Sequence, residues 1–126
     1  MYSPIVWQHL RDTQNRGRMA DPHGVGESTF SKCGDHLTVQ LRLEDGRIQE
    51  VSFLAKACSP VVAVASLATT QLIGKTPEEA RQLSVLQLDQ DIGGLPAPKR
   101  HALWMLLEAL FNALDQATAA STSGNS

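Results

Sequence analysis

One β-hairpin, bracketed by two cysteines, constrains this sequence more than any other feature. Apolar and polar residues alternate over residues 37–43, which is typical of a half-buried strand. Asp45-Gly46 then predicts a tight turn, and residues 48–57 predict the partner strand. The hairpin should therefore carry Cys33 and Cys58, the only cysteines of the chain, back towards each other.

The second strand of this hairpin departs from strict alternation near its start. Val51 and Phe53 share one face, but Ile48 is three residues before Val51 and so falls out of step with them. A β-bulge near Gln49-Glu50 would restore the pattern, because a bulge inserts one extra residue into one strand.

Helical spacing and end signals predict the other elements. They place helices over residues 4–15, 60–73, 76–83 and 98–117, a further turn over 84–91, and a short first strand over 26–32. Gly93 to Pro98 is predicted to be an extended, proline-stiffened linker. The fold class is therefore predicted to be α+β, with a small antiparallel sheet of about three strands packed against helices on one face.

Length and composition favour one domain and a single core. The chain has 126 residues, of which 42% are hydrophobic and 19% charged. We expect a single domain over residues 1–117 and a small, polar, disordered tail over 118–126. The last helix is apolar nearly all round, which favours either deep burial or a contact in a homodimer.

Charge and hydropathy exclude several classes of partner. The net charge of -2 and the lack of a basic block argue against nucleic acid and anionic membranes. The longest apolar stretch, residues 61–73, contains polar residues and is too short to span a bilayer. The first residues do not resemble a secretory signal, so we expect a cytoplasmic protein. In that compartment a cysteine pair is more often a metal or reactive site than a disulfide.

Four side chains are candidate metal ligands: Cys33, Asp35, Cys58 and His101. Cys33 and Asp35 are two residues apart, so an extended backbone points both the same way. Cys58 precedes a predicted helix N-terminus, which stabilises a thiolate. His101 lies in the first turn of the last helix, whereas His9, His23 and His36 fit no ligand pattern. This set of sulfur, oxygen and nitrogen donors suits zinc or an iron–sulfur cluster.

Two other interpretations of these residues stay open. Each cysteine could be a small apolar filler, and His101 could face solvent at the start of its helix. Cys58 could also be a nucleophile activated by His101. No orienting third group or oxyanion motif is visible, so the sequence predicts that the protein is not an enzyme.

The chain resembles the IscU/NifU-type family of iron–sulfur cluster assembly scaffolds from Tyr2 to about Leu114. The resemblance rests on motifs in a fixed order: Tyr2-Ser3-Pro4-Ile5-Val6 with His9, Gly24-Val25-Gly26-Glu27, Cys33-Gly34-Asp35, Asp45-Gly46-Arg47-Ile48, Cys58 with Ala65-Ser66-Leu67-Ala68-Thr69 and Gly74-Lys75-Thr76, and Leu95-Pro96-Ala97-Pro98-Lys99 before His101.

This resemblance implies a scaffold or carrier that binds iron or a transient [2Fe-2S] cluster through the four candidate ligands. It also implies a cysteine desulfurase and iron–sulfur recipient proteins as partners. An Hsp70-type chaperone is implied as the partner of residues 95–99.

The sequence departs from the family where a third cysteine normally follows the histidine, because this chain has Ala102 there. Alanine cannot ligate a metal. The alternative is therefore a degenerate member that binds zinc, or no metal, and acts as an interaction protein.

Overall fold

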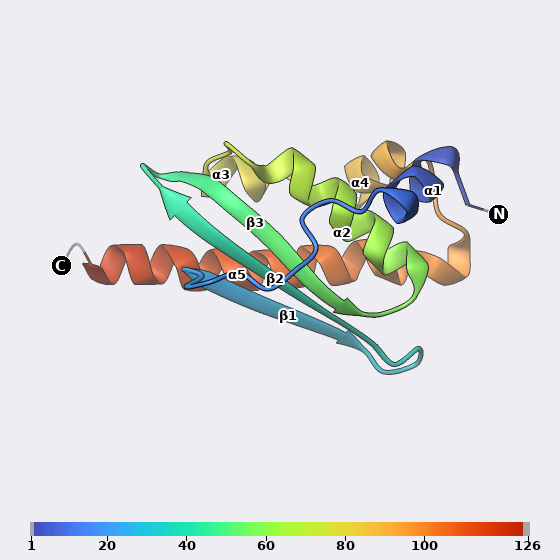
Figure 1. Ribbon diagram of the computed structural model, residues 1–126, viewed down its shortest axis with the longest axis horizontal. Coiled ribbons are helices and arrows are strands. Elements are labelled where there is room, and N and C mark those ends of the chain that lie inside the picture. Colours follow the sequence, from blue (N-terminus) through green and yellow to red (C-terminus); the bar gives the residue numbers. More distant parts are fainter. Residues whose placement is uncertain (1, 125–126) are drawn as a thin grey trace.

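The computed structural model describes residues 2–124, with the side chains of residues 2–119. The elements follow one another in this order: α1 (Pro4–Arg11), β1 (Gly24–Phe30), β2 (Asp35–Glu44), β3 (Arg47–Lys56), α2 (Ser59–Leu72), α3 (Pro77–Ala80), α4 (Val85–Ile92), the 3₁₀ helix η1 (Ala97–Lys99) and α5 (His101–Gly124). Figure 1 shows these helices and strands in chain order. The predicted α+β class with a three-stranded antiparallel sheet is confirmed.

The sheet has the order β1-β2-β3, so β2 is its central strand. Both neighbours run antiparallel to β2. The register shifts near the hairpin turn, where Arg42 pairs with Glu50 but Leu43 pairs with Ile48. Gln49 is therefore the extra residue of β3, which confirms the predicted bulge.

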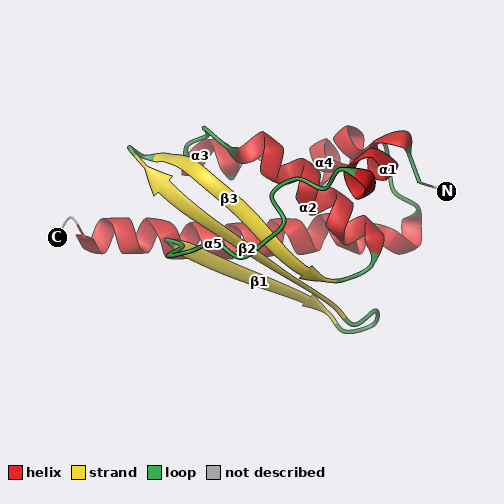
Figure 2. Ribbon diagram, viewed as in Figure 1, coloured by secondary structure: helices red, strands yellow, loops and turns green. Residues whose placement is uncertain are grey.

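The long helices lie together on one face of the sheet, as Figure 2 shows. Helix α5 packs against β1 and β2, while α2 packs against β3 and α5. The largest fully buried side chains come from both layers: Val6, Leu37, Leu41, Ile48, Phe53, Leu72, Leu88, Ile92, Leu103, Leu106, Leu110 and Leu114. The core therefore lies between the sheet and these two helices.

Strand β1 allows α5 to approach very closely because it carries glycine where its inner face meets the helix. A Cβ atom at Gly26 would overlap the backbone carbonyl oxygen of Ala109. At Gly24 it would overlap the carbonyl oxygen of Ala113. This close approach fixes α5, and therefore its first residue His101, against the sheet.

Several helix ends follow the sequence signals. The side chain of Ser3 accepts a hydrogen bond from the Val6 N–H at 3.1 Å, and Thr76 with Glu79 forms a capping box. Helix α2 begins one residue before the predicted start at residue 60, because Cys58 occupies the N-cap position and Ser59 is already helical. Cys58 makes no side-chain capping bond.

The C-terminal boundary also differs from the sequence prediction. Helix α5 continues to Gly124, where the sequence predicted an end at about residue 117 and a disordered tail. Residues 125–126 of that tail lie outside the described part of the chain. The linker before α5 is not fully extended either, since residues 97–99 form a 3₁₀ turn. Among residues 2–124, no helix has the length and apolar character needed to cross a membrane.

Candidate metal centre

The four predicted ligands lie in the β1–β2 turn, at the start of β2, at the β3–α2 junction and at the start of α5, and they gather at one end of the sheet. Cys33 lies in the turn between β1 and β2, and Asp35 is the first residue of β2. Cys58 lies between β3 and α2, and His101 begins α5. The predicted hairpin accounts for three of these positions, and the packing of α5 supplies the fourth.

The carboxylate of Asp35 is at the centre of this cluster and is almost fully buried. Its Oδ1 accepts a hydrogen bond from the Cys58 N–H at 3.0 Å, and its Oδ2 accepts one from the Cys58 thiol at 3.2 Å. The same Oδ2 lies 2.9 Å from Nε2 of His101. Burial raises the pKa of Asp35, but the bonds from His101 and Cys58 outweigh burial, so its pKa lies below the ordinary value.

The Cys58 thiol is half-buried, with its Sγ 3.9 Å from Nε2 of His101. Burial, together with the hydrogen bond to Asp35, raises the pKa of this thiol above its ordinary value. The sequence predicted a thiolate stabilised by the helix N-terminus. Burial and the neighbouring carboxylate outweigh that effect, so the thiol acts as hydrogen-bond donor to Oδ2 of Asp35.

The imidazole of His101 is held by a neighbour that sequence reasoning missed. Phe30, at the end of β1, stacks on it with ring centroids 4.2 Å apart and planes 12° from parallel. Nδ1 of His101 is buried without a hydrogen-bond partner in the described part of the chain. The ring is therefore oriented by Phe30 and by the bond from Nε2 to Asp35. An aromatic residue three positions before Cys33 was the available sequence signal.

Cys33 differs from Cys58 in being exposed to solvent. It lies in a tight turn in which Gly34 adopts a φ of +68°, a left-handed conformation that favours glycine. The candidate ligand atoms of Cys33, Asp35 and His101 all lie within 4.8 Å of one another. The site therefore has one exposed thiol at its mouth and buried groups behind it.

The separations between the donor atoms lie on either side of those found around a single tetrahedral ion. Nitrogen, oxygen and sulfur donors around such an ion lie roughly 3.3–3.8 Å apart. The pairs among Asp35 Oδ2, Cys58 Sγ and His101 Nε2 are separated by 2.9, 3.2 and 3.9 Å. Small shifts would convert these hydrogen bonds into metal bonds, with the thiol proton lost.

Two neighbouring positions do not add ligands. His36 points to the outer face of the sheet, where its ring contacts Glu27 at 3.2 Å and Thr29 at 3.1 Å. Ala102 is fully buried, although it follows His101 directly. The place of the family's third cysteine is thus part of the core packing in this chain.

The segment of residues 95–99 is anchored to the fold near the site. Leu95 is buried, and its N–H donates to Oδ1 of Asp89 at 3.1 Å. Arg100 binds the other oxygen of Asp89 at 2.8 Å. Ala97 and Pro98 are exposed between these two anchors.

Comparison with known proteins decides the family. The family model described as the NifU-like N terminal domain matches residues 1–122. This chain belongs to the NifU-like N-terminal domain family. The IscU/NifU resemblance drawn from the sequence motifs is therefore confirmed.

Curated relatives of this NifU-like chain carry scaffold names. The chain is 34% identical over 114 residues to iron-sulfur cluster assembly scaffold protein IscU 1 of Archaeoglobus fulgidus, covering 90% of this chain and 74% of that protein. It is 31% identical over 113 residues to iron-sulfur cluster assembly scaffold protein IscU of Azotobacter vinelandii, covering 86% and 88%.

Solved structures show the same fold. A NifU-like protein (N-terminal) from Brucella abortus superposes with a TM-score of 0.73 at 19% identity, covering 93% of this chain and 94% of that one. A putative iron-sulfur cluster assembly scaffold protein for the SUF system from Fervidobacterium islandicum also gives 0.73, at 20% identity, covering 90% and 96%.

Proposed function

We propose that this NifU-like protein is a scaffold for iron–sulfur cluster assembly. In this proposal it holds iron or a nascent [2Fe-2S] cluster through Cys33, Asp35, Cys58 and His101. The observation that carries it is the convergence of thiol, carboxylate and imidazole at one end of the sheet, with three of their ligand atoms within 4.8 Å. Iron and its cluster are then the cargo of the protein, and the chain itself is not an enzyme.

The four side chains suit a cargo that must enter and leave. Cys33 is exposed in a turn, so it can meet incoming iron without opening the core. Asp35 holds Cys58 and His101 in place before metal arrives. Its hydrogen bonds keep the buried donors satisfied, which makes the metal-free state stable enough to receive a new cargo.

Partners follow from the same proposal. A cysteine desulfurase supplies sulfur, and iron–sulfur recipient proteins accept the finished cluster in the cytoplasm. An Hsp70-type chaperone binds residues 95–99. The Leu95 N–H is hydrogen-bonded to Asp89. A chaperone that binds this segment as an extended peptide must therefore first break that hydrogen bond.

Anaerobic reconstitution tests the scaffold proposal directly. Purified protein is incubated with ferrous iron, sulfide and a reductant, desalted, and read by visible absorption and circular dichroism. Sulfur-to-iron charge-transfer bands with a fixed iron-to-protein ratio are expected for the wild type. Cys33→Ser and Cys58→Ser should lose most of the signal, whereas His36→Ala, outside the cluster, should keep it. A folded wild type without these bands contradicts the proposal.

A second candidate is a zinc-binding interaction protein without scaffold activity. It is favoured by the buried Ala102, which leaves four ligands, the number that a closed zinc site uses. Metal analysis of the protein as isolated separates the candidates. One zinc per chain that resists exchange with ferrous iron supports this alternative, whereas ready replacement by iron supports the scaffold.

A further inference from the structure

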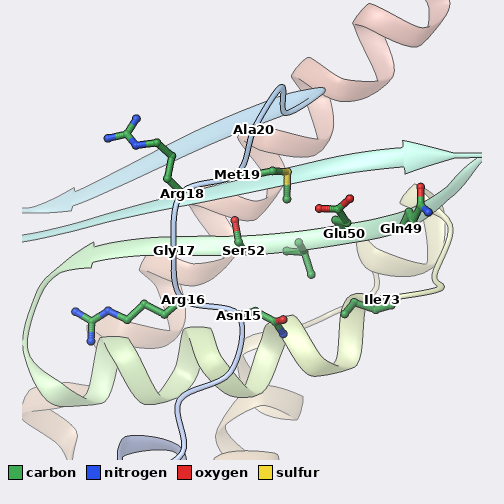
Figure 3. A pocket seen from close by; sticks show the side chains of 11 residues that line it. Asn15, Arg16, Gly17, Arg18, Met19, Ala20, Gln49, Glu50, Ser52 and Ile73 are labelled. Atoms are coloured by element: carbon green, nitrogen blue, oxygen red, sulfur yellow. The ribbon is translucent and has the colours of Figure 1, made fainter.

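The segment of residues 12–23, which we call the strap, joins α1 to β1 and crosses β3 on its way. Figure 3 shows part of it, Asn15 to Ala20, passing in front of β3, with α2 alongside and a shallow pocket next to the crossing. The strap therefore lies beside both elements that flank Cys58 in the sequence: β3, which ends at Lys56, and α2, which begins at Ser59.

Backbone hydrogen bonds attach the strap to β3. The Phe53 N–H donates to the carbonyl oxygen of Asn15 at 3.0 Å, and the Gly17 N–H donates to the carbonyl oxygen of Phe53 at 2.9 Å. These bonds form an isolated parallel bridge between Arg16 and Phe53. The attachment lies five residues before Cys58.

Side-chain hydrogen bonds attach the same segment to α2. Oγ of Ser66 accepts from the Gln14 N–H at 2.8 Å and lies 2.8 Å from Nδ1 of His9 in α1. One turn further, the Asn15 amide donates to Oγ1 of Thr69 at 3.1 Å. Ser66 and Thr69 are both fully buried.

Ser66 and Thr69 carry the only hydroxyl groups among the buried residues of α2. The other buried residues of α2 are apolar or proline: Pro60, Val61, Val62, Ala63, Val64, Ala65, Ala68 and Leu72. A buried hydroxyl is costly unless it is hydrogen-bonded. The partners of Ser66 come from α1 and the strap, so the polar residue on this apolar face is explained by the strap.

We infer that Ser66 is a positioning residue of the metal centre. Through the strap it clamps α2 to β3, and this clamp fixes the junction at which Cys58 presents its thiol to Asp35. Ser66 touches no candidate ligand, so it acts only through this junction. The consequence for metal retention rests on the proposed function, whereas the effect on the Cys58 thiol does not.

The first test needs no metal. In a Cys33→Ser background, Cys58 is the only thiol, and its rate of reaction with a disulfide reagent reports how firmly it is held against Asp35. Ser66→Ala removes the hydrogen bonds of Oγ to the Gln14 N–H and to Nδ1 of His9. It should raise this rate at least about fivefold, the factor expected for loss of one buried hydrogen bond. The control is Thr70→Val, because Thr70 lies on the same helix but its hydroxyl bonds only the Leu67 carbonyl of that helix. It should leave the rate unchanged.

A second variant keeps the test valid if Ser66→Ala fails to fold. Asn15 is exposed and has a φ of +60°, which glycine adopts without strain, so Asn15→Gly removes only the amide bond to Thr69. It should also accelerate the reaction of Cys58. Unchanged rates in both folded variants would overturn the inference, and an increase equal to that in Thr70→Val would do the same.

Cobalt then separates this inference from the proposed function. With both cysteines present, Co²⁺ should give thiolate charge-transfer absorption, and a chelator should remove it about fivefold faster from Ser66→Ala than from Thr70→Val. If the wild type binds no Co²⁺ but Ser66→Ala still accelerates the reaction of the Cys58 thiol, the positioning role of Ser66 is supported and the proposed metal site is contradicted. If Co²⁺ binds, but the thiol reaction rate and the rate of cobalt removal in Ser66→Ala both equal those in Thr70→Val, the positioning role is contradicted and the metal site is supported.

Discussion

Nε2 of His101 lies 2.9 Å from Oδ2 of Asp35, although 66 residues separate them in the sequence. This contact ties the start of α5 to the start of β2. Because the same carboxylate also accepts both the N–H and the thiol of Cys58, it connects three elements at one point. Asp35 therefore organises the site before any metal is present.

Replacing Asp35 should destabilise the metal-free protein. Asp35→Ala leaves the Cys58 N–H and the His101 ring without their acceptor in a buried place, which we expect to lower the free energy of unfolding by about 1–3 kcal/mol. Urea denaturation of the apoprotein measures this change. Asp115→Ala is the control, since Asp115 forms an exposed ion pair with Arg81 and should cost little. Equal effects of the two substitutions would contradict the central role of Asp35.

Phe30 should control how tightly His101 binds a metal. Phe30→Ala removes the ring that stacks on His101, so the imidazole gains freedom and zinc affinity should fall roughly tenfold. Competition with a chromophoric chelator measures the affinity. Phe30→Tyr keeps an aromatic ring in the stack and should retain the wild-type value. An unchanged affinity in Phe30→Ala would show that Asp35 alone orients the histidine.

Restoring a thiol after His101 should not by itself restore a third accessible cysteine. Ala102 is fully buried, so the added sulfur of Ala102→Cys enters a packed region and should cost about 1 kcal/mol of stability. In native protein, the new thiol should react with a disulfide reagent much more slowly than exposed Cys33. Peptide mapping after timed alkylation identifies each site. Equally fast labelling of both would mean that the start of α5 opens readily.

The stability of the protein should decrease in mild acid because of His9. Burial lowers the pKa of His9 below 6.5, although the charge of Asp12 opposes this shift. The unfolded chain then binds a proton more readily than the folded one. The stabilisation from neutral His9 is therefore complete above the ordinary pKa and declines as pH falls below it.

Urea midpoints from about pH 8 to about pH 5.5 check this prediction, since the ordinary histidine pKa lies inside that window. His9→Gln should show a shallower decline than the wild type. His23→Gln provides the matched control, because His23 is exposed. Parallel curves for wild type and His9→Gln would assign the pH dependence to other groups.

Local sequence signals were sufficient for the hairpin and for much of the helical layer. They placed the first strand over 26–32 instead of Gly24–Phe30, and they extended the first helix to residue 15 although it ends at Arg11. Alternation and Asp45-Gly46 specified the hairpin, and the mismatch at Ile48 indicated a bulge near Gln49-Glu50, which the structure places at Gln49. The C-terminal end of α5 was misplaced, because small and polar residues beyond 117 carry no strong helix signal, yet the helix continues to Gly124. Periodicity describes the face that a segment buries, and it becomes weak where a helix extends past its core.

The sequence by itself determined the residue types of the candidate site and three of its positions. A hairpin with a defined turn must return Cys58 towards Cys33 and Asp35, because strand pairing fixes the register. Only the tertiary structure decided that His101 contacts Asp35 and that Phe30 stacks on its ring. It also decided that Cys58 is half-buried beside a carboxylate that raises its pKa, while Cys33 is exposed. These features depend on the packing of α5 and α2 against the sheet, through contacts between residues far apart in the chain that local spacing does not encode.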